Sequence, residues 1–173
     1  MLGSPESRGD NHEALHHFHS IAAAHCRTAH SRRVRNGPPP TPVSTTETFA
    51  AGEACQFPIQ VVTTGKSGFN DLPNNPQFVG IATSPTLRIT VTRTAPPIKS
   101  ITVNATGAFR FIALPDGNTR ILAGGHNFLY GVPGVGAGAL ATTGPIDVLV
   151  VNNNIAAMDL SGAQVRDLCQ ELS

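Results

Sequence analysis

The stretch FRFIALPDGNTRILAGG, residues 109–125, decides the fold class of this chain. Two apolar runs flank the tetrapeptide PDGN at 115–118, and its residues suit a tight turn. Pro presets the backbone φ, Asp bonds back to the main chain, and Gly accepts a positive φ. Two apolar runs joined by such a turn predict a β-hairpin.

Further strands are predicted on the N-terminal side of this hairpin. TLRITVTRT (86–94) and SITVNATG (100–107) both alternate apolar and polar residues, which is typical of half-buried strands. CQFPIQVV (55–62) predicts a first strand, in which Pro58 favours an edge position or a strand start. GKSGFNDLPNNPQ (65–77) is dense in turn-forming residues, and we expect it to be a loop.

On the C-terminal side, HNFLYG (126–131) predicts the next strand, followed by a Gly-rich loop up to Gly144. PIDVLVV (145–151) is apolar at nearly every position, as in a central strand that is covered on both faces. Three Asn residues then turn the chain into IAAMDL (155–160).

The end of the chain changes to a helical pattern. Ser161 and Gln164 have the spacing of a capping box. Apolar residues then recur at the spacing of one helix face, at Val165, Leu168, Cys169 and Leu172. These signals predict a short helix over about 162–171. Short strands with one terminal helix predict an all-β domain, either an antiparallel β-sandwich or a small β-barrel.

Composition and charge divide the 173 residues into a tail and one domain. No Asp or Glu occurs over 14–46, where four Arg and five His fall, and the stretch 35–47 is rich in Pro. We therefore expect 1–46 to be a disordered, basic tail and linker and 47–173 to be the all-β domain. The net charge of +1 gives no electrostatic basis for binding nucleic acid or an anionic membrane.

Apolar runs in the sequence are short. None approaches the roughly 18 residues of a membrane span. None forms the continuous apolar stretch of about 7–15 residues that a secretory signal needs. The sequence therefore predicts no transmembrane segment and carries no legible export signal.

Two of the three cysteines lie at opposite ends of the predicted domain. Cys55 precedes its first strand and Cys169 lies on its last helix, whereas Cys26 falls in the tail. A Cys55–Cys169 disulfide would tie the two ends together and would indicate an oxidising compartment. The alternative is a pair of unrelated buried thiols, because free Cys is among the most buried residue types. The position of the two residues favours the bridge.

The predicted domain resembles a family of small secreted actinobacterial proteins of uncharacterised function. The resemblance extends over about 47–172 and rests on four segments: ETFAAGEACQFPI, SITVNATGAFRFIALPDGNTRILAGGHNFLYG, TTGPIDVLVV and VRDLCQEL. It implies an extracellular or cell-surface location and cysteines near both ends of the domain, matching Cys55 and Cys169. It supplies no activity.

Catalytic and metal-binding constellations are not legible in the sequence. His126 is the one histidine of the predicted domain, but no serine has the context of a nucleophile and no carboxylate pair is evident. The tail histidines lack the further ligands of a closed metal site. The glycines of 131–138 are not followed by the helix that a phosphate-binding loop requires. We therefore predict no catalytic residue, metal or cofactor.

Two functional hypotheses follow from these observations. The first is a secreted or surface-associated domain that acts by binding, or as a structural component, without catalysis. The second is a β-barrel that holds a small apolar ligand, or performs simple chemistry, in its mouth. In the second hypothesis the polar groups of the ligand site are His126, Tyr130 and Arg110.

Overall fold

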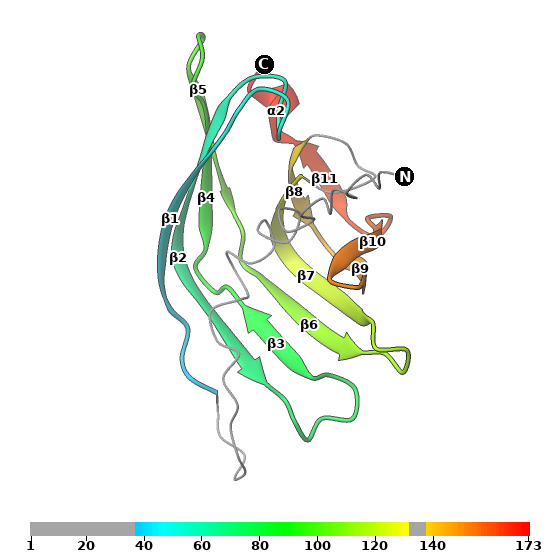
Figure 1. Cartoon of the computed structure of the whole chain (residues 1–173). Coiled ribbons are helices and arrows are strands. Elements are labelled where there is room, and N and C mark those ends of the chain that lie inside the picture. Colours follow the sequence, from blue (N-terminus) through cyan, green and yellow to red (C-terminus); the bar gives the residue numbers. More distant parts are fainter. Residues whose placement is uncertain (1–36, 132–137) are drawn as a thin grey trace, which may run out of the picture.

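The computed structural model describes residues 37–131 and 138–173, and most of this part of the chain is antiparallel β-strand (Figure 1). In chain order the elements are β1 (Thr41–Phe49), β2 (Ile59–Asp71), β3 (Gly80–Thr83), β4 (Arg88–Arg93), β5 (Lys99–Asn104), β6 (Gly107–Ala113), β7 (Thr119–Tyr130), β8 (Ala139–Thr143), β9 (Ile146–Val151), β10 (Asn154–Asp159), β11 (Gln164–Asp167) and the helix α2 (Leu168–Glu171). The predicted all-β fold with one short C-terminal helix is confirmed.

The strands form one strongly bent sheet, in which three regions can be distinguished. Sheet A contains β1, β2, β4 and β5, and sheet B contains β3, β6, β7, β9 and β10. Sheet C contains β8, β11 and the last part of β7. Among the described strands no pairing joins β10 back to β5, so the sheet is open. Of the two predicted architectures, this one is a sandwich rather than a closed barrel.

Two long strands connect the regions because each changes partner along its length. β2 pairs with β4 up to Thr64 and with β3 from Gly68. β7 pairs with β9 up to Ala123 and with β8 from His126. Gly125 lies at this second change with a φ of 85°, a conformation that strains residues with a Cβ. The glycine therefore allows β7 to pass from one sheet into another.

Two hydrophobic clusters make up the core. The first lies between sheets A and C and includes Ile59, Val91, Phe128 and the α2 residue Leu168. The second packs sheet B against the other face of sheet C, and its buried members are Ile121, Ala123, Leu129, Leu140, Ile146 and Val148. Sheet C thus has apolar neighbours on both faces, as the burial of four of the five β8 residues shows.

The prediction for the region around β8 was wrong. β8 is the strand covered on both faces, although its segment was expected to belong to a Gly-rich loop. In β9, by contrast, only Ile146 and Val148 are buried and the other four residues are half-exposed. Residues 126–130 are the continuation of β7 and not a separate strand. Which strand lies inside depends on how the sheet bends, and periodicity does not report that bend.

On the N-terminal side, the strands are longer than predicted. β2 begins at Ile59 and runs to Asp71, through residues 65–71 that were expected to form a loop. β1 begins at Thr41, within the predicted linker, and pairs with β2 over nine residues. Hydrogen bonding to strands on both sides of β2 outweighs the preference of its Gly, Asn and Asp residues for turns. Pro42 is tolerated in β1 because β1 is an edge strand. Residues 1–36, which include the histidines of the predicted tail and Cys26, lie outside the described residues.

The C-terminal helix is shorter than predicted. Residues 164–167 form β11, which pairs with β8, and only Leu168–Glu171 are helical. The N-cap is Asp167, whose carboxylate accepts a hydrogen bond from the N–H of Gln170 (3.1 Å), and not Ser161. Pairing with β8 therefore overrides the helical spacing in the first half of this segment.

Candidate functional site

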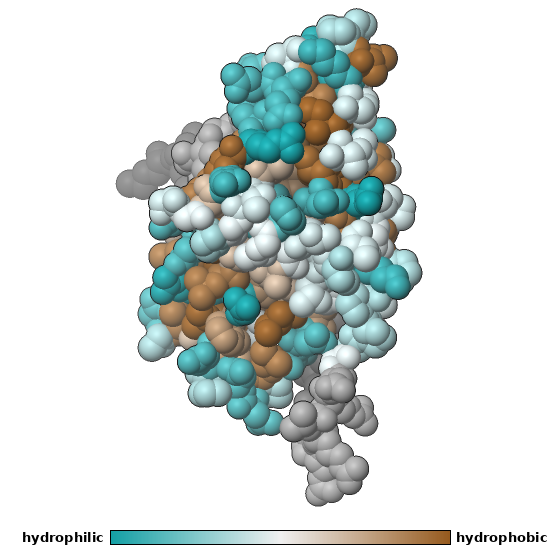
Figure 2. Space-filling view, turned by 180° about the vertical axis from the view of Figure 1, so that it is seen from behind, coloured by the Kyte–Doolittle hydropathy of each residue, from teal (hydrophilic) through white to brown (hydrophobic). Residues whose placement is uncertain are grey.

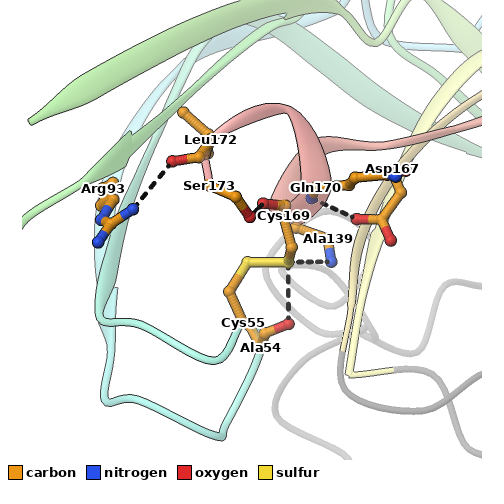
Figure 3. Close-up of a disulfide and its surroundings, with 9 residues drawn as sticks. All are labelled: Ala54, Cys55, Arg93, Ala139, Asp167, Cys169, Gln170, Leu172 and Ser173. Carbon is orange, nitrogen blue, oxygen red and sulfur yellow. Dashed lines mark hydrogen bonds between the residues drawn. A yellow bond between two sulfur atoms is a disulfide. The ribbon is translucent and has the colours of Figure 1, made fainter. Parts of the chain in front are cut away.

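A disulfide joins Cys55 to Cys169, as predicted, and links the loop before β2 to α2 (Figure 3). The two Cα atoms are 5.5 Å apart, and Cys55 is only 1% exposed. The N–H of Ala139 donates a hydrogen bond to Sγ of Cys169 (3.3 Å), which connects the bridge to β8. The disulfide therefore holds sheet A, sheet C and α2 together at one end of the domain.

Tyr130, a predicted ligand-binding residue, lies at the end of β7 and is half-buried. Its hydroxyl donates a hydrogen bond to Oε2 of Glu47 on β1 (2.8 Å). Its ring packs against Phe49 and Phe128, with centroids 5.1 and 5.5 Å away. Burial raises the pKa of Tyr130, and the bond to Glu47 raises it further. The residue ties β1 to β7.

The other two predicted ligand-binding residues lie elsewhere. His126 is exposed, and its Nδ1 is 3.0 Å from Oγ1 of Thr143. Arg110 lies on β6 opposite Leu122, and its guanidinium is 6.0 Å from the ring centroid of Phe78. His126 is four residues from Leu122, and Tyr130 is four residues further on. Each step is about 13 Å along a strand, so the fold does not bring the three residues into one site.

We expect Tyr130→Phe to destabilise the fold by about 1–2 kcal/mol, because it removes the bond to Glu47 and keeps the ring contacts. The raised pKa means that the folded state favours the neutral phenol. The contribution of Tyr130 to the stability of the fold is complete below the pKa of about 10 that tyrosine has in the unfolded chain. It is lost as the pH rises above that value towards the higher pKa of the folded state. Chemical denaturation of both proteins at neutral and alkaline pH measures this.

Tyr130 is the only tyrosine, and the chain has no tryptophan, so the absorbance of the phenolate reports on this residue alone. The folded chain should titrate at a higher pH than the denatured chain. Titration at the same pH in both states would contradict the buried bond to Glu47.

The outer face of sheet B carries aliphatic side chains mixed with two arginines. Its members on neighbouring strands are Ile81, Arg110, Ile112, Arg120, Leu122, Leu149 and one carboxylate, Asp147. The four aliphatic residues are half-exposed, and Figure 2 shows hydrophobic side chains interrupted by hydrophilic ones in the lower part of the molecule. This face is turned away from the second cluster, and the described elements leave its aliphatic side chains partly exposed.

The two arginines of this face differ in their partners. Nε of Arg120 donates a hydrogen bond to Oδ1 of Asp147 (2.8 Å), and this contact lowers the pKa of the Asp147 carboxyl. Arg110 has no hydrogen bond or ion pair to a carboxylate among the described residues. The outer face of sheet B thus presents one cation that lacks a carboxylate partner in this part of the chain.

A row of buried polar side chains crosses the interior. The polar row consists of Ser67 on β2, Ser84 after β3, Asn127 on β7 and Thr142 on β8. Ser67 and Ser84 lie one residue beyond the last β2–β3 pair, and Asn127 pairs with Thr142. Gly107 links the two halves: its carbonyl accepts a bond from the N–H of Ser84 (3.0 Å), and a Cβ on it would lie 2.5 Å from Oδ1 of Asn127.

The side chains of the polar row do not satisfy one another. Five of their atoms have no hydrogen-bond partner among the described residues: Oγ of Ser67, Oγ of Ser84, Oδ1 and Nδ2 of Asn127, and Oγ1 of Thr142. A buried polar atom without a partner costs about 1–3 kcal/mol, and the whole stability of a domain is about 5–15 kcal/mol. Five such atoms would together cost about as much free energy as the whole domain gains on folding. The polar atoms of the row therefore require hydrogen-bond partners beyond the described side chains.

The sequence did not predict either the polar row or the outer face of sheet B. Ser84, which follows β3, and Thr142 on β8 are buried, but an isolated polar residue in a sequence gives no sign of its burial. The outer face of sheet B was visible only as alternation, and the contrast between Arg110 and Arg120 depends on β9 lying beside β7. The described residues contain no group of three or more His, Cys, Asp or Glu placed to hold a metal ion.

Comparison with protein families, with curated proteins and with solved structures finds no match to this chain. Over the ranges 37–131 and 138–173, no helix is long and apolar enough to cross a membrane. The fold and the disulfide define an open, bent, all-β domain that is fastened at one end.

Proposed function

We propose that this chain is a binding module of the extracellular space or the cell surface and acts without catalysis. The compartment is supported by the Cys55–Cys169 disulfide, because structural disulfides form and persist in oxidising environments. The bridge joins the loop before β2 to α2, and such a crosslink suits a domain exposed to solvent and proteases.

The binding surface that we propose is the outer face of sheet B. The observation that carries this proposal is Arg110, an exposed cation without a carboxylate partner among the described residues, surrounded by half-exposed aliphatic side chains. Arginine surrounded by apolar area is typical of the energetically important centre of protein interfaces. The partner that fits is a protein whose aliphatic surface presents a carboxylate to Arg110.

The alternative of a small apolar ligand in the mouth of a barrel has less support. The described sheet is open, and His126, Tyr130 and Arg110 lie apart along it. A ligand held by all three side chains would have to span about 25 Å of strand. A surface that binds a macromolecule matches this arrangement better.

A charge-reversal pair tests the proposal. The full chain is immobilised and exposed to the secreted and cell-surface proteins of its own host, and captured proteins are compared between variants. Arg110→Glu should reduce capture of the partner at least tenfold, because it places like charges together. Arg88→Glu is the matched control, since Arg88 is an exposed arginine on β4 of sheet A, and it should leave capture unchanged. Equal capture by both variants would contradict the proposed surface.

A further inference from the structure

We propose that the polar row is an internal hydration site, in which ordered water molecules are bound to its four buried side chains. Ser84, Asn127 and Thr142 are between 1% and 2% exposed, and Ser67 is 7% exposed. All four carry polar side-chain atoms that no described residue satisfies. In native proteins such atoms are nearly always bonded to protein or to ordered water. The polar row is therefore the place in the interior where ordered water is bound.

The chemistry of the polar row selects a neutral guest. Each hydroxyl and the carboxamide of Asn127 can both donate and accept hydrogen bonds, as water does. None of the four side chains carries a charge, so a buried ion would lack a compensating partner. A buried water molecule typically makes about three hydrogen bonds, and four adjacent polar side chains with nearby strand carbonyls provide them.

The position of the polar row explains why its side chains do not form hydrogen bonds with one another. It lies where β2 and β7 change partners, next to the positive-φ residue Gly125. Gly107 lets the Asn127 side chain lie against the backbone, because a Cβ at position 107 would come within 2.5 Å of Oδ1 of Asn127 and clash with it. Because β2 and β7 exchange one neighbouring strand for another here, regular pairing is interrupted at the row, and a bound molecule supplies the hydrogen bonds that the polar side chains lack.

A crystal structure of the full chain, grown without polyols and at a resolution that shows ordered solvent, tests the proposal directly. We expect at least one water within hydrogen-bonding distance of the Asn127 side chain and a second partner in the row. Native mass spectrometry of the same material should show no retained organic molecule. A direct bond between Asn127 and Thr142 with no water, or an ion or organic ligand at the row, would overturn the proposal.

A matched pair of variants gives a second readout. Thr142→Val keeps the shape of the side chain but removes the buried hydroxyl, so the water bonded to it should disappear from the crystal structure. Thr64→Val is the control, because Thr64 is an exposed threonine on β2, and it should leave the row unchanged. If Thr142→Val does not fold, magnetisation transfer from water to the Asn127 amide protons in the native chain decides. Absence of that transfer would contradict bound water.

Discussion

Removing the disulfide by Cys55→Ser should lower the free energy of unfolding by about 4 kcal/mol. The bridge joins residues 114 positions apart, and closing a loop of this length restricts the unfolded chain by about 4–5 kcal/mol in the chain-entropy description. At about 2–4 °C per kcal/mol for a chain of this size, the melting temperature should fall by roughly 8–16 °C. Differential scanning calorimetry of the two proteins measures this change.

The third cysteine provides the control for this experiment. Cys26→Ser removes the cysteine that the bridge does not use, so the bridge stays intact and the melting temperature should stay within about 1 °C. Counting thiols in denaturant without reductant should find one per chain. Three free thiols, or a melting temperature that does not respond to Cys55→Ser, would contradict a structural bridge.

Leu168→Ala should have the second large effect, a loss of about 2–5 kcal/mol. The Leu168 side chain is fully buried in the first cluster, where it belongs to the short helix α2. Truncation loses its transfer free energy and leaves a cavity, and the helix itself has too few residues to hold its place alone. Urea denaturation measures the loss as a lower midpoint with an unchanged slope.

Val165 offers a nearby control for the truncation. It lies on β11, three residues before Leu168, and is 45% exposed. Val165→Ala should change the stability by no more than about 0.5 kcal/mol, as is usual for exposed positions. A loss for Val165→Ala as large as that for Leu168→Ala would contradict the burial of Leu168 as the cause of the larger effect. The helical pattern alone placed both residues on one buried face, so the pair also separates the structure from the sequence expectation.

Local chemistry was enough to predict the parts of the fold that depend on neighbouring residues. The PDGN turn forms the β6–β7 connection, where Asp116 accepts a bond from the N–H of Asn118 (3.0 Å). The alternation in 86–94 and 100–107 correctly predicted β4 and β5, which bury Ile89, Val91 and Val103. Turns and half-buried strands can be predicted because each depends on the types and spacing of a few adjacent residues.

Burial on two faces could not be predicted, because it depends on what lies above and below a strand. β8 resembles a loop in sequence, yet sheets A and B both pack against sheet C, in which it lies. The second half of β2 was expected to be a loop, yet it pairs with β1 and β3. Small and polar residues are tolerated there because neighbouring strands supply the hydrogen bonds and the contacts.

The sequence by itself determined that this protein is an all-β domain with a terminal helix and a cysteine at each end. Those properties follow from alternation, turn chemistry and the positions of Cys55 and Cys169. Only the tertiary structure decided that the sheet stays open, that Arg110 lacks a carboxylate partner among the described residues where Arg120 has one, and that the polar row lies inside. These depend on contacts between strands far apart in the chain, which no local pattern encodes.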